Sequence, residues 1–343
     1  MKIVELNEKE YEEREKDFSC FTFLQSYLWG EVMKSLGYKV FRLGFFENEN
    51  LIGLVQLISV KARRGKFLKI EHGPLFENEN HFWKMVESLL LWIKENRLHK
   101  NHLYLRITPN LEYSEERIQK MKSLGFKMAP RWLVSESFWI KRIDVDEESL
   151  LKELSPHHRK LIIDSLKKPY IEIKTGGDFE TFWKIYQDIS LRKDFVPYPY
   201  ELVKNEFEIF KSKNMAELYF GIVEGKVLSS ALIIFYKDSA YYHHGGSIPT
   251  KEPVNYKLHW KIILDAKNRG CKFYNFWGIL PRSFYKDLPP NHPWQGFSKF
   301  KTGFGGKLIK TLPTFDYPFS LKYYPIKLYE KLSEKLRFIN KFN

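Results

Sequence analysis

The ten residues from Phe297 to Gly306, FSKFKTGFGG, combine side chains that could hold a nucleotide end and act on it. An aromatic ring such as Phe300 can stack on a base, while the ammonium of Lys299 or Lys301 faces phosphate or a developing oxyanion. The glycines allow the backbone to bend and to come close to a ligand. The same residues also fit an ordinary amphipathic helix with phenylalanines in the core and lysines in water. The surrounding chain must decide between the two.

Length and charge narrow the possible partners. With 343 residues, 43% of them hydrophobic, the chain is expected to form about two domains with sizeable cores. The 56 Lys and Arg against 42 Asp and Glu give a net charge of +14. This excess favours a polyanionic partner, which could be nucleic acid, a phosphorylated small molecule or an anionic membrane surface. A chain that is simply rich in lysine is the alternative.

The cysteines and the apolar runs indicate the compartment. Cys20 and Cys271 are far apart and lack metal-ligand spacing, which is typical of free thiols in a reducing compartment. Residues 1–17 contain no apolar run, and no window approaches the ~18 apolar residues of a membrane span. We therefore expect a cytoplasmic protein, with any contact to the inner membrane surface being peripheral.

The order of predicted elements occurs twice along the chain. Helix, hairpin, strand, helix, strand, helix and strand are predicted in residues 1–148 and again in 149–320, followed by a basic helix over 321–343. Turn residues mark both hairpin tips, at 47–50 and at 224–225. Such repetition indicates duplicated α/β units, although any α/β chain gives rough matches by chance. The order resembles tandem acyltransferase domains of the GCN5-related type, in the α/β (α+β) class, whose mixed central sheet splits into a V.

Several familiar chemical signatures are missing. The sequence contains no GxGxxG after a strand, no P-loop, no HExxH and no serine nucleophile elbow. The pairs His157–His158 and His243–His244 are adjacent residues, and neighbours on a strand point to opposite faces, so we expect neither pair to chelate a metal by itself. A loop that would bind the pyrophosphate of coenzyme A is also missing after the Gly73 and Gly246 regions. We expect no cofactor and no metal, and an acyl donor other than coenzyme A.

Seven pieces of the chain, in order, carry a family resemblance. They are FLQSYLWGEVMKSLGYKVFRLG, GPLF, HHRKLIIDSLKK, ISLRKDF, YYHHGGS, AKNRGCKFYNFWGI and HPWQGFSKFKTGFGG. With them the chain resembles the Fem family (FemA, FemB, FemX) of non-ribosomal peptidyltransferases. The resemblance implies transfer of an amino acid from aminoacyl-tRNA to the stem peptide of a peptidoglycan precursor, either UDP-MurNAc-pentapeptide or lipid II. It also implies two fused acyltransferase-like domains, 1–148 and 149–320, with the helix over 321–343 returning to the first.

The layout is similar to FemX, because the stretch from Phe195 to Tyr219 has room for a short helical segment only and not for the long coiled-coil arm of FemA-like members.

The resemblance also implies roles for individual residues. Lys34 and Arg192 match positions for the precursor diphosphate, although each could equally be a surface helix cation. Tyr242 matches a position that lines the acceptor channel. Phe300 matches a ring on which the terminal adenosine of the tRNA could stack. Lys301 matches a cation at the reacting ester, where it would stabilise the oxyanion formed during aminolysis.

Two residues depart from the family pattern. Asn275 stands where the family commonly has Asp, and Phe195 stands where some members carry Tyr. No general base is evident beside Lys301, so the substrate itself would accept the proton. Two alternatives stay open: a Fem-like N-acyltransferase with another donor or acceptor, and a non-catalytic protein that binds tRNA or a cell-wall precursor. Asn275 favours the second, whereas the intact KF and GFGG pieces argue against it.

Overall fold

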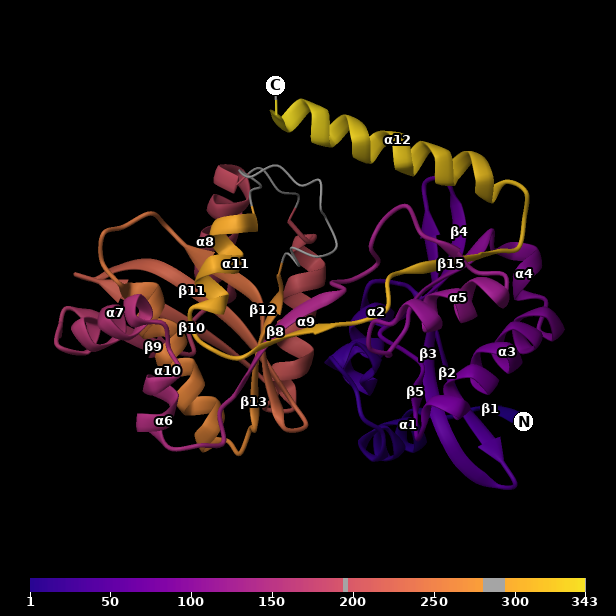
Figure 1. Ribbon diagram of the computed structural model, residues 1–343, viewed down its shortest axis with the longest axis horizontal. Coiled ribbons are helices and arrows are strands. Elements are labelled where there is room, and N and C mark those ends of the chain that lie inside the picture. The colour runs from indigo at the N-terminus through magenta and orange to yellow at the C-terminus, as the bar shows by residue number, and fades with distance from the viewer. Residues whose placement is uncertain (194–196, 280–293, 343) are drawn as a thin grey trace. The chain divides into compact units, whose positions relative to one another are not determined.

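The computed structural model describes residues 1–193, 197–279 and 294–342 (Figure 1). The chain forms two compact units, each built on one mixed sheet. Unit 1 contains Met1–Glu136 and Lys310–Asn343, and unit 2 contains Ser137–Ile309. Among the described residues, no helix has the length and the apolar character that are needed to cross a membrane.

The sheet of unit 1 has the strand order β1-β2-β3-β4-β6-β15-β7, and β5 pairs with β3. Its one parallel pair is β4 with β6, whereas the other neighbours are antiparallel. At the tip of the β2–β3 hairpin, Asn48 and Glu49 have positive φ, which confirms the first predicted turn. The strands are β1 (Lys2–Glu5), β2 (Lys39–Glu47), β3 (Asn50–Ala62), β4 (Gly65–Glu71), β5 (Leu75–Phe76), β6 (Tyr104–Thr108), β7 (Lys127–Met128) and β15 (Phe315–Pro318).

Helix α3 supplies much of the core of unit 1. It begins after Asn78, whose side chain accepts a hydrogen bond from the backbone N–H of His81. Its apolar residues recur at helical spacing and are buried. The helices of this unit are α1 (Glu8–Arg14), η1 (Glu15–Asp17), η2 (Phe23–Gln25), α2 (Tyr27–Ser35), α3 (Glu79–Glu95), α4 (Leu98–Asn101), α5 (Glu115–Ser123) and α12 (Tyr323–Phe342).

The sheet of unit 2 has the strand order β14-β8-β13-β12-β11-β10-β9. Its parallel pair is β12 with β13, and Glu224 and Gly225 form the predicted hairpin tip with positive φ. The strands are β8 (Ser137–Arg142), β9 (Ile171–Thr175), β10 (Ala216–Val223), β11 (Lys226–Tyr236), β12 (Ser239–Ser247), β13 (Phe273–Gly278) and β14 (Lys307–Lys310).

Helices α10 and α8 both pack on the sheet of unit 2. Buried residues of α10 join a core with β10, β11 and β12. The short α9 occupies the stretch in which only a short helical segment was predicted. The helices are α6 (Glu147–Lys152), α7 (Pro156–Leu166), α8 (Phe179–Lys193), α9 (Tyr200–Ser212), α10 (Val254–Asn268) and α11 (Trp294–Thr302).

The two sheets share one topology, which confirms the predicted duplication. In each, a run of antiparallel strands is followed by one parallel pair and then by an antiparallel strand from a distant part of the chain. That last strand is exchanged: β8 follows the helices of unit 1 but pairs with β13, and β15 follows unit 2 but pairs with β6. The compact units therefore divide at 136/137 and 309/310, whereas the boundaries expected from the sequence were 148/149 and 320/321.

Helix α12 is tied to unit 1 by a buried charge network. Arg106 of β6 contacts Asp316 with two guanidinium nitrogens, at 2.7 and 2.9 Å, and contacts Glu330 of α12 at 2.8 Å. Tyr323, at the start of the helix, donates a hydrogen bond to Asp316. Removing one partner would leave a buried charge unpaired, so this network fixes where the C-terminal segment packs.

Candidate active site in unit 2

The parallel strands β12 and β13 pair over three residues and then stop. Ser239–Tyr241 lies opposite Phe273–Asn275, and no pairing is seen beyond. Each strand is bulged just past this point. On β12, Leu232 and Ile233 of β11 face His244 and Tyr242, which leaves His243 as the extra residue. On β13, the register with β8 shifts between Asn275 and Gly278. Bulges of this kind commonly redirect side chains next to active sites.

Asn275 shapes the bulge of β13. Its Oδ1 accepts a hydrogen bond of 2.8 Å from the backbone N–H of Trp277. Trp277 has φ of 64°, a left-handed conformation that is rare for a bulky residue. An Asp at position 275 could accept the same bond, so the departure from the family pattern retains this local role.

Lys301 lies at the end of this bulge. Its Nζ donates a hydrogen bond of 2.8 Å to the carbonyl of Gly278, and it lies 3.7 Å from the ring centroid of Phe297 and 5.6 Å from that of Tyr242. The residue is 1% exposed, and no carboxylate pairs with it in the described part of the chain. Burial lowers the pKa of Lys301 well below its ordinary value, because the charged form loses its hydration. Burial therefore shifts the equilibrium of this amine toward its neutral form.

His259 is a further residue of this site, and the sequence did not reveal it. It lies on α10 with its ring centroid 4.6 Å from that of Tyr242 and 5.3 Å from that of Phe300, and it shares a hydrogen bond of 2.9 Å with the hydroxyl of Tyr274. Burial, and then repulsion from Lys301, lower the pKa of His259 to about 3. The only signal in the sequence is one histidine among the apolar positions of a helix.

The aromatic residues and lysines of α11 and of the turn that follows it are not buried as in an ordinary amphipathic helix. Phe304 is buried and Lys299 is exposed, as that interpretation predicts, but Phe297 is 42% exposed and Lys301 is buried. The prediction is wrong for this pair because Lys301 reaches inward to the Gly278 carbonyl. Phe300 is half-buried, and its ring packs on His158, Tyr256 and His259. The exposed ring beside the lysine is therefore Phe297.

The glycines after α11 lie close to neighbouring protein segments. A Cβ on Gly303 would overlap the ring of His158, and one on Gly306 would overlap the carbonyl of Ile140. Gly305 and Gly306 also have φ of 77° and 105°. These positions need glycine because the segment packs closely on β8 and on the start of α7.

Arg192 and Lys34 both take part in local ion pairs. Arg192 of α8 contacts Asp188 at 2.7 Å and donates to the carbonyl of Ser247, which ends β12, at 2.8 Å. Lys34 belongs to α2 of unit 1 and pairs with Glu8 at 2.5 Å and Glu31 at 3.1 Å. Within unit 2, Lys301, Tyr242 and Phe300 are brought together, and Arg192 bonds to the end of the strand that carries Tyr242.

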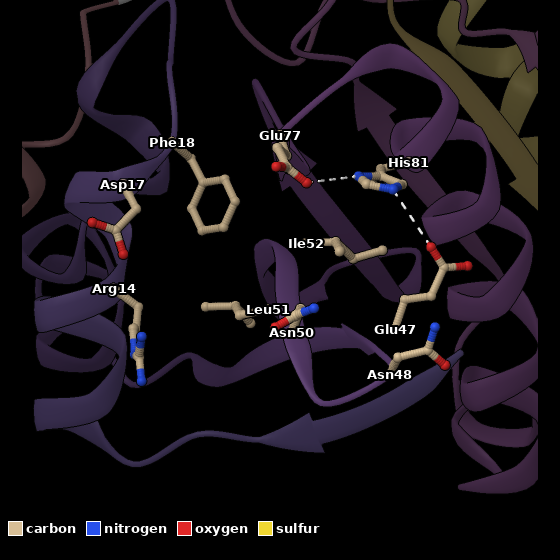
Figure 2. A pocket seen from close by; sticks show the side chains of 10 residues that line it. All are labelled: Arg14, Asp17, Phe18, Glu47, Asn48, Asn50, Leu51, Ile52, Glu77 and His81. Atoms are coloured by element: carbon tan, nitrogen blue, oxygen red, sulfur yellow. Dashed lines mark ion pairs between the residues drawn. The ribbon is translucent and has the colours of Figure 1, made fainter.

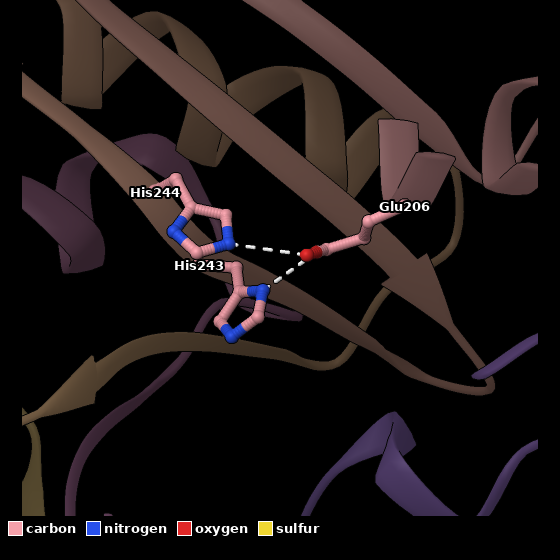
Figure 3. A group of neighbouring side chains, drawn as sticks. All are labelled: Glu206, His243 and His244. Atoms are coloured by element: carbon pink, nitrogen blue, oxygen red, sulfur yellow. Dashed lines mark hydrogen bonds and ion pairs between the residues drawn. The ribbon is translucent and has the colours of Figure 1, made fainter. Parts of the chain in front are cut away.

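Both histidines of the 243–244 pair contact Glu206 of α9 (Figure 3). The prediction that they point to opposite faces is wrong, because the bulge at His243 cancels the alternation of the strand. In the other pair, His157 is exposed, while His158 donates from Nε2 to the carbonyl of Phe300 at 2.8 Å. Phe195 and the first two residues of HPWQGFSKFKTGFGG lie outside the described residues.

A pocket of about 510 Å³ lies in unit 1 (Figure 2). His81 is placed between Glu77, at 3.2 Å, and Glu47, at 3.5 Å. None of the predicted site residues lines this pocket. Three acids, Asp17, Glu47 and Glu77, outnumber the one arginine that lines it, Arg14, so the pocket suits a polyanionic substrate poorly.

A comparison with protein-family models identifies the family of this chain. The model of the FemAB family matches residues 6–223 and 204–331, which together cover nearly the whole chain. The chain belongs to the FemAB family. Membership of this family supports a transferase function in peptidoglycan synthesis. No curated protein matches it in sequence.

Solved structures share the fold of this FemAB protein. FemX is 18% identical with a TM-score of 0.79, over 96% of this chain and 100% of that one. L-PGS from Bacillus licheniformis is 12% identical with a TM-score of 0.55, over 95% and 97% of the two chains. A tandem GNAT protein from the clavulanic acid biosynthesis pathway is 9% identical with a TM-score of 0.54, over 93% and 98%. These likenesses show the tandem acyltransferase fold that the sequence predicted.

Proposed function

We propose that this FemAB protein transfers an aminoacyl group from aminoacyl-tRNA to an amine of the stem peptide of UDP-MurNAc-pentapeptide or lipid II. The observation that carries the proposal is the burial of Lys301 where β12 and β13 cease to pair, beside Tyr242 and the exposed Phe297. The net charge of +14 suits two polyanionic substrates, and the sequence lacks a pyrophosphate loop for coenzyme A.

The reaction is the aminolysis of an ester. The stem-peptide amine attacks the aminoacyl carbonyl carbon, a C–N bond forms, the C–O bond to the tRNA ribose breaks, and the ribose hydroxyl leaves with a proton. The attacking nitrogen must lose a proton, and the tetrahedral oxyanion must be stabilised. The nitrogen and the oxyanion are bonded to the same tetrahedral carbon, so one well-placed side chain could serve both.

Lys301 can meet both requirements in sequence. As a neutral amine it accepts the proton of the attacking nitrogen, and the resulting ammonium stabilises the oxyanion and then protonates the leaving ribose oxygen. The sequence had assigned only the charge to Lys301 and had revealed no base. The burial of Lys301 supports a role as the base, because it lowers the pKa of the amine and so eases loss of its proton.

The remaining residues bind and orient the substrates in this proposal. Phe297 offers the exposed ring for the terminal adenosine, while Phe300, the residue expected from the resemblance, holds α11 on the core. Tyr242 lines the acceptor side of Lys301. Arg192 and Lys34 bind the diphosphate by exchanging their present carboxylate partners for phosphate oxygens.

The test is incubation of the full chain with a mixture of charged tRNAs and either precursor, followed by mass analysis of the product. We expect the precursor to gain the mass of one amino acid, and we expect ribonuclease to abolish the gain. Lys301→Met is the matched negative control. If neither precursor gave a product, the proposed transfer would be wrong and a binding function would be favoured. If an acyl thioester alone gave the product, the donor would be the thioester and not aminoacyl-tRNA.

A further inference from the structure

Three side chains at the bulge of β12 form a compact cluster that the proposed reaction does not use. Glu206 Oε1 lies 2.6 Å from His243 Nδ1, and Glu206 Oε2 lies 3.1 Å from His244 Nε2. One ligand atom from each of the three residues lies within 4.8 Å of the other two. Figure 3 shows both rings turned toward the same carboxylate. The cluster joins α9 to β12, two elements that are far apart in the sequence.

The bulge creates this arrangement. In a regular strand, His243 and His244 would face opposite sides of the sheet. Because His243 is the extra residue opposite Leu232 and Ile233, the alternation is interrupted there and both rings lie on the side of α9. Their ring centroids are 4.0 Å apart. The backbone of β12 is thus built to present two imidazoles together.

The electrostatics of the cluster favour a cation. The side chain of Glu206 is 0% exposed, and its ion pairs in the described part of the chain are with the two histidines. A buried carboxylate without a partner is unfavourable, and the two imidazoles lie within hydrogen-bond distance of this one. Buried charges in proteins are paired or coordinate a metal.

We propose that Glu206, His243 and His244 bind one divalent transition-metal ion of the zinc type. Two imidazole nitrogens and one carboxylate oxygen are a donor set that Zn²⁺ uses, whereas Mg²⁺ and Ca²⁺ prefer oxygen alone. With bonds of about 2.0–2.2 Å, ligand atoms around a tetrahedral Zn²⁺ lie about 3.3 Å apart. The nitrogens now lie 2.6 and 3.1 Å from different oxygens of the carboxylate, and the three ligand atoms lie within 4.8 Å of one another, so the side chains must shift to reach this geometry.

The cluster lies next to the bulge of β13, so a bound ion would affect the backbone near Lys301. The ring of His243 lies 4.4 Å, between centroids, from the ring of Trp277 in the bulge of β13. Trp277 is followed by Gly278, whose carbonyl accepts the hydrogen bond of Lys301. A metal at His243 would therefore hold α9 against β12 and support the backbone that positions the Lys301 amine. The binding itself does not depend on the proposed aminoacyl transfer.

Metal binding to the full-length chain tests this inference directly. After treatment with a chelator and dialysis, Zn²⁺ is titrated by calorimetry and Co²⁺ by visible absorption. We expect one ion per chain and the intense absorption of tetrahedral cobalt with nitrogen ligands. Glu206→Gln and His244→Gln should weaken the affinity by more than about 100-fold, since even outer-shell changes cost 10–100-fold.

Two histidine variants serve as controls. His157→Ala removes an exposed histidine, and His81→Ala removes one that also lies between two carboxylates, so both should bind as the unmodified chain does. Circular dichroism establishes whether Glu206→Gln and His244→Gln fold. The cobalt spectrum of the unmodified chain tests the inference even if these variants do not fold. Failure to bind one ion at micromolar concentration, an octahedral all-oxygen cobalt spectrum, or equal affinity in a folded Glu206→Gln variant would overturn the inference.

Discussion

Lys301 Nζ donates a hydrogen bond of 2.8 Å to the carbonyl oxygen of Gly278, and this bond fixes a lysine amine inside the core of unit 2. Gly278 ends a bulged strand that Asn275 and Trp277 shape. The amine is thus positioned by a backbone irregularity and not by a carboxylate partner. Because no carboxylate of the described residues pairs with this amine, burial is the main influence on its protonation.

Replacing Lys301 separates its charge from its basicity. Lys301→Met removes both, and Lys301→Arg keeps the charge but cannot accept a proton. We expect turnover to fall by about 100-fold or more in each variant, as when an oxyanion donor is lost. Calorimetry should show nearly unchanged precursor binding. Full turnover in Lys301→Arg would restrict Lys301 to electrostatic stabilisation, and full turnover in Lys301→Met would remove it from the mechanism.

The lowered pKa of Lys301 also predicts how stability and rate depend on pH. Between that pKa and the ordinary lysine value of 10.5, the unfolded chain binds more protons than the folded one, so stability rises with pH across this window. Lys301→Met should flatten the rise and increase Tm, by about 2–4 °C for each kcal/mol gained. Turnover of the unmodified chain should rise as the amine becomes neutral. Calorimetry measures Tm across this pH window. A Tm of Lys301→Met below that of the unmodified chain at every pH would contradict the prediction.

Two phenylalanines of α11 should behave differently. Phe297→Ala removes an exposed ring and should weaken tRNA binding by about 10-fold with little change in Tm, since stacking on one base contributes about 1–3 kcal/mol. Phe300→Ala removes packing on His158 and His259 and should lower the free energy of unfolding by about 2 kcal/mol or more. Filter binding and denaturant unfolding measure the two effects. The reverse pattern would return the stacking role to Phe300.

Gly303 should tolerate no side chain. A Cβ there would overlap the ring of His158, whose Nε2 donates to the Phe300 carbonyl, so Gly303→Ala should cost about 1–3 kcal/mol of stability. Gly296→Ala, in the preceding helix α11, is the control, because a Cβ at Gly296 meets nothing within 4 Å. Urea unfolding compares the two. Equal stability of the variants would show that His158 can move away at no cost.

Arg192 and Lys34 are expected to contribute to precursor binding. Arg192→Ala and Lys34→Ala should each weaken the affinity by about 10-fold, and more strongly at low salt, because each removes a charged contact to phosphate. Arg142→Ala and Lys152→Ala remove exposed cations that also pair with a nearby carboxylate, and serve as controls. Calorimetry with UDP-MurNAc-pentapeptide measures the effect. Affinities equal to those of the controls would remove the diphosphate assignment.

The sequence by itself determined the duplicated α/β architecture, both hairpin tips and the family. These features depend on local patterns: apolar periodicity gives the helices, turn residues give the tips, and short ordered pieces carry the family resemblance. It also indicated the segment that contains Lys301, because lysines, phenylalanines and glycines alternate there.

Tertiary structure alone decided which strands close each sheet and which side chains meet. The exchange of β8 and β15 depends on hydrogen bonds between distant strands, so order along the chain misplaced the boundaries. The bulge at His243 turned two neighbouring histidines to one side, which regular alternation forbids. Burial of Lys301 depends on a carbonyl that a second bulge presents. Local patterns assume regular strands and ordinary solvation, and this site is formed where both assumptions fail.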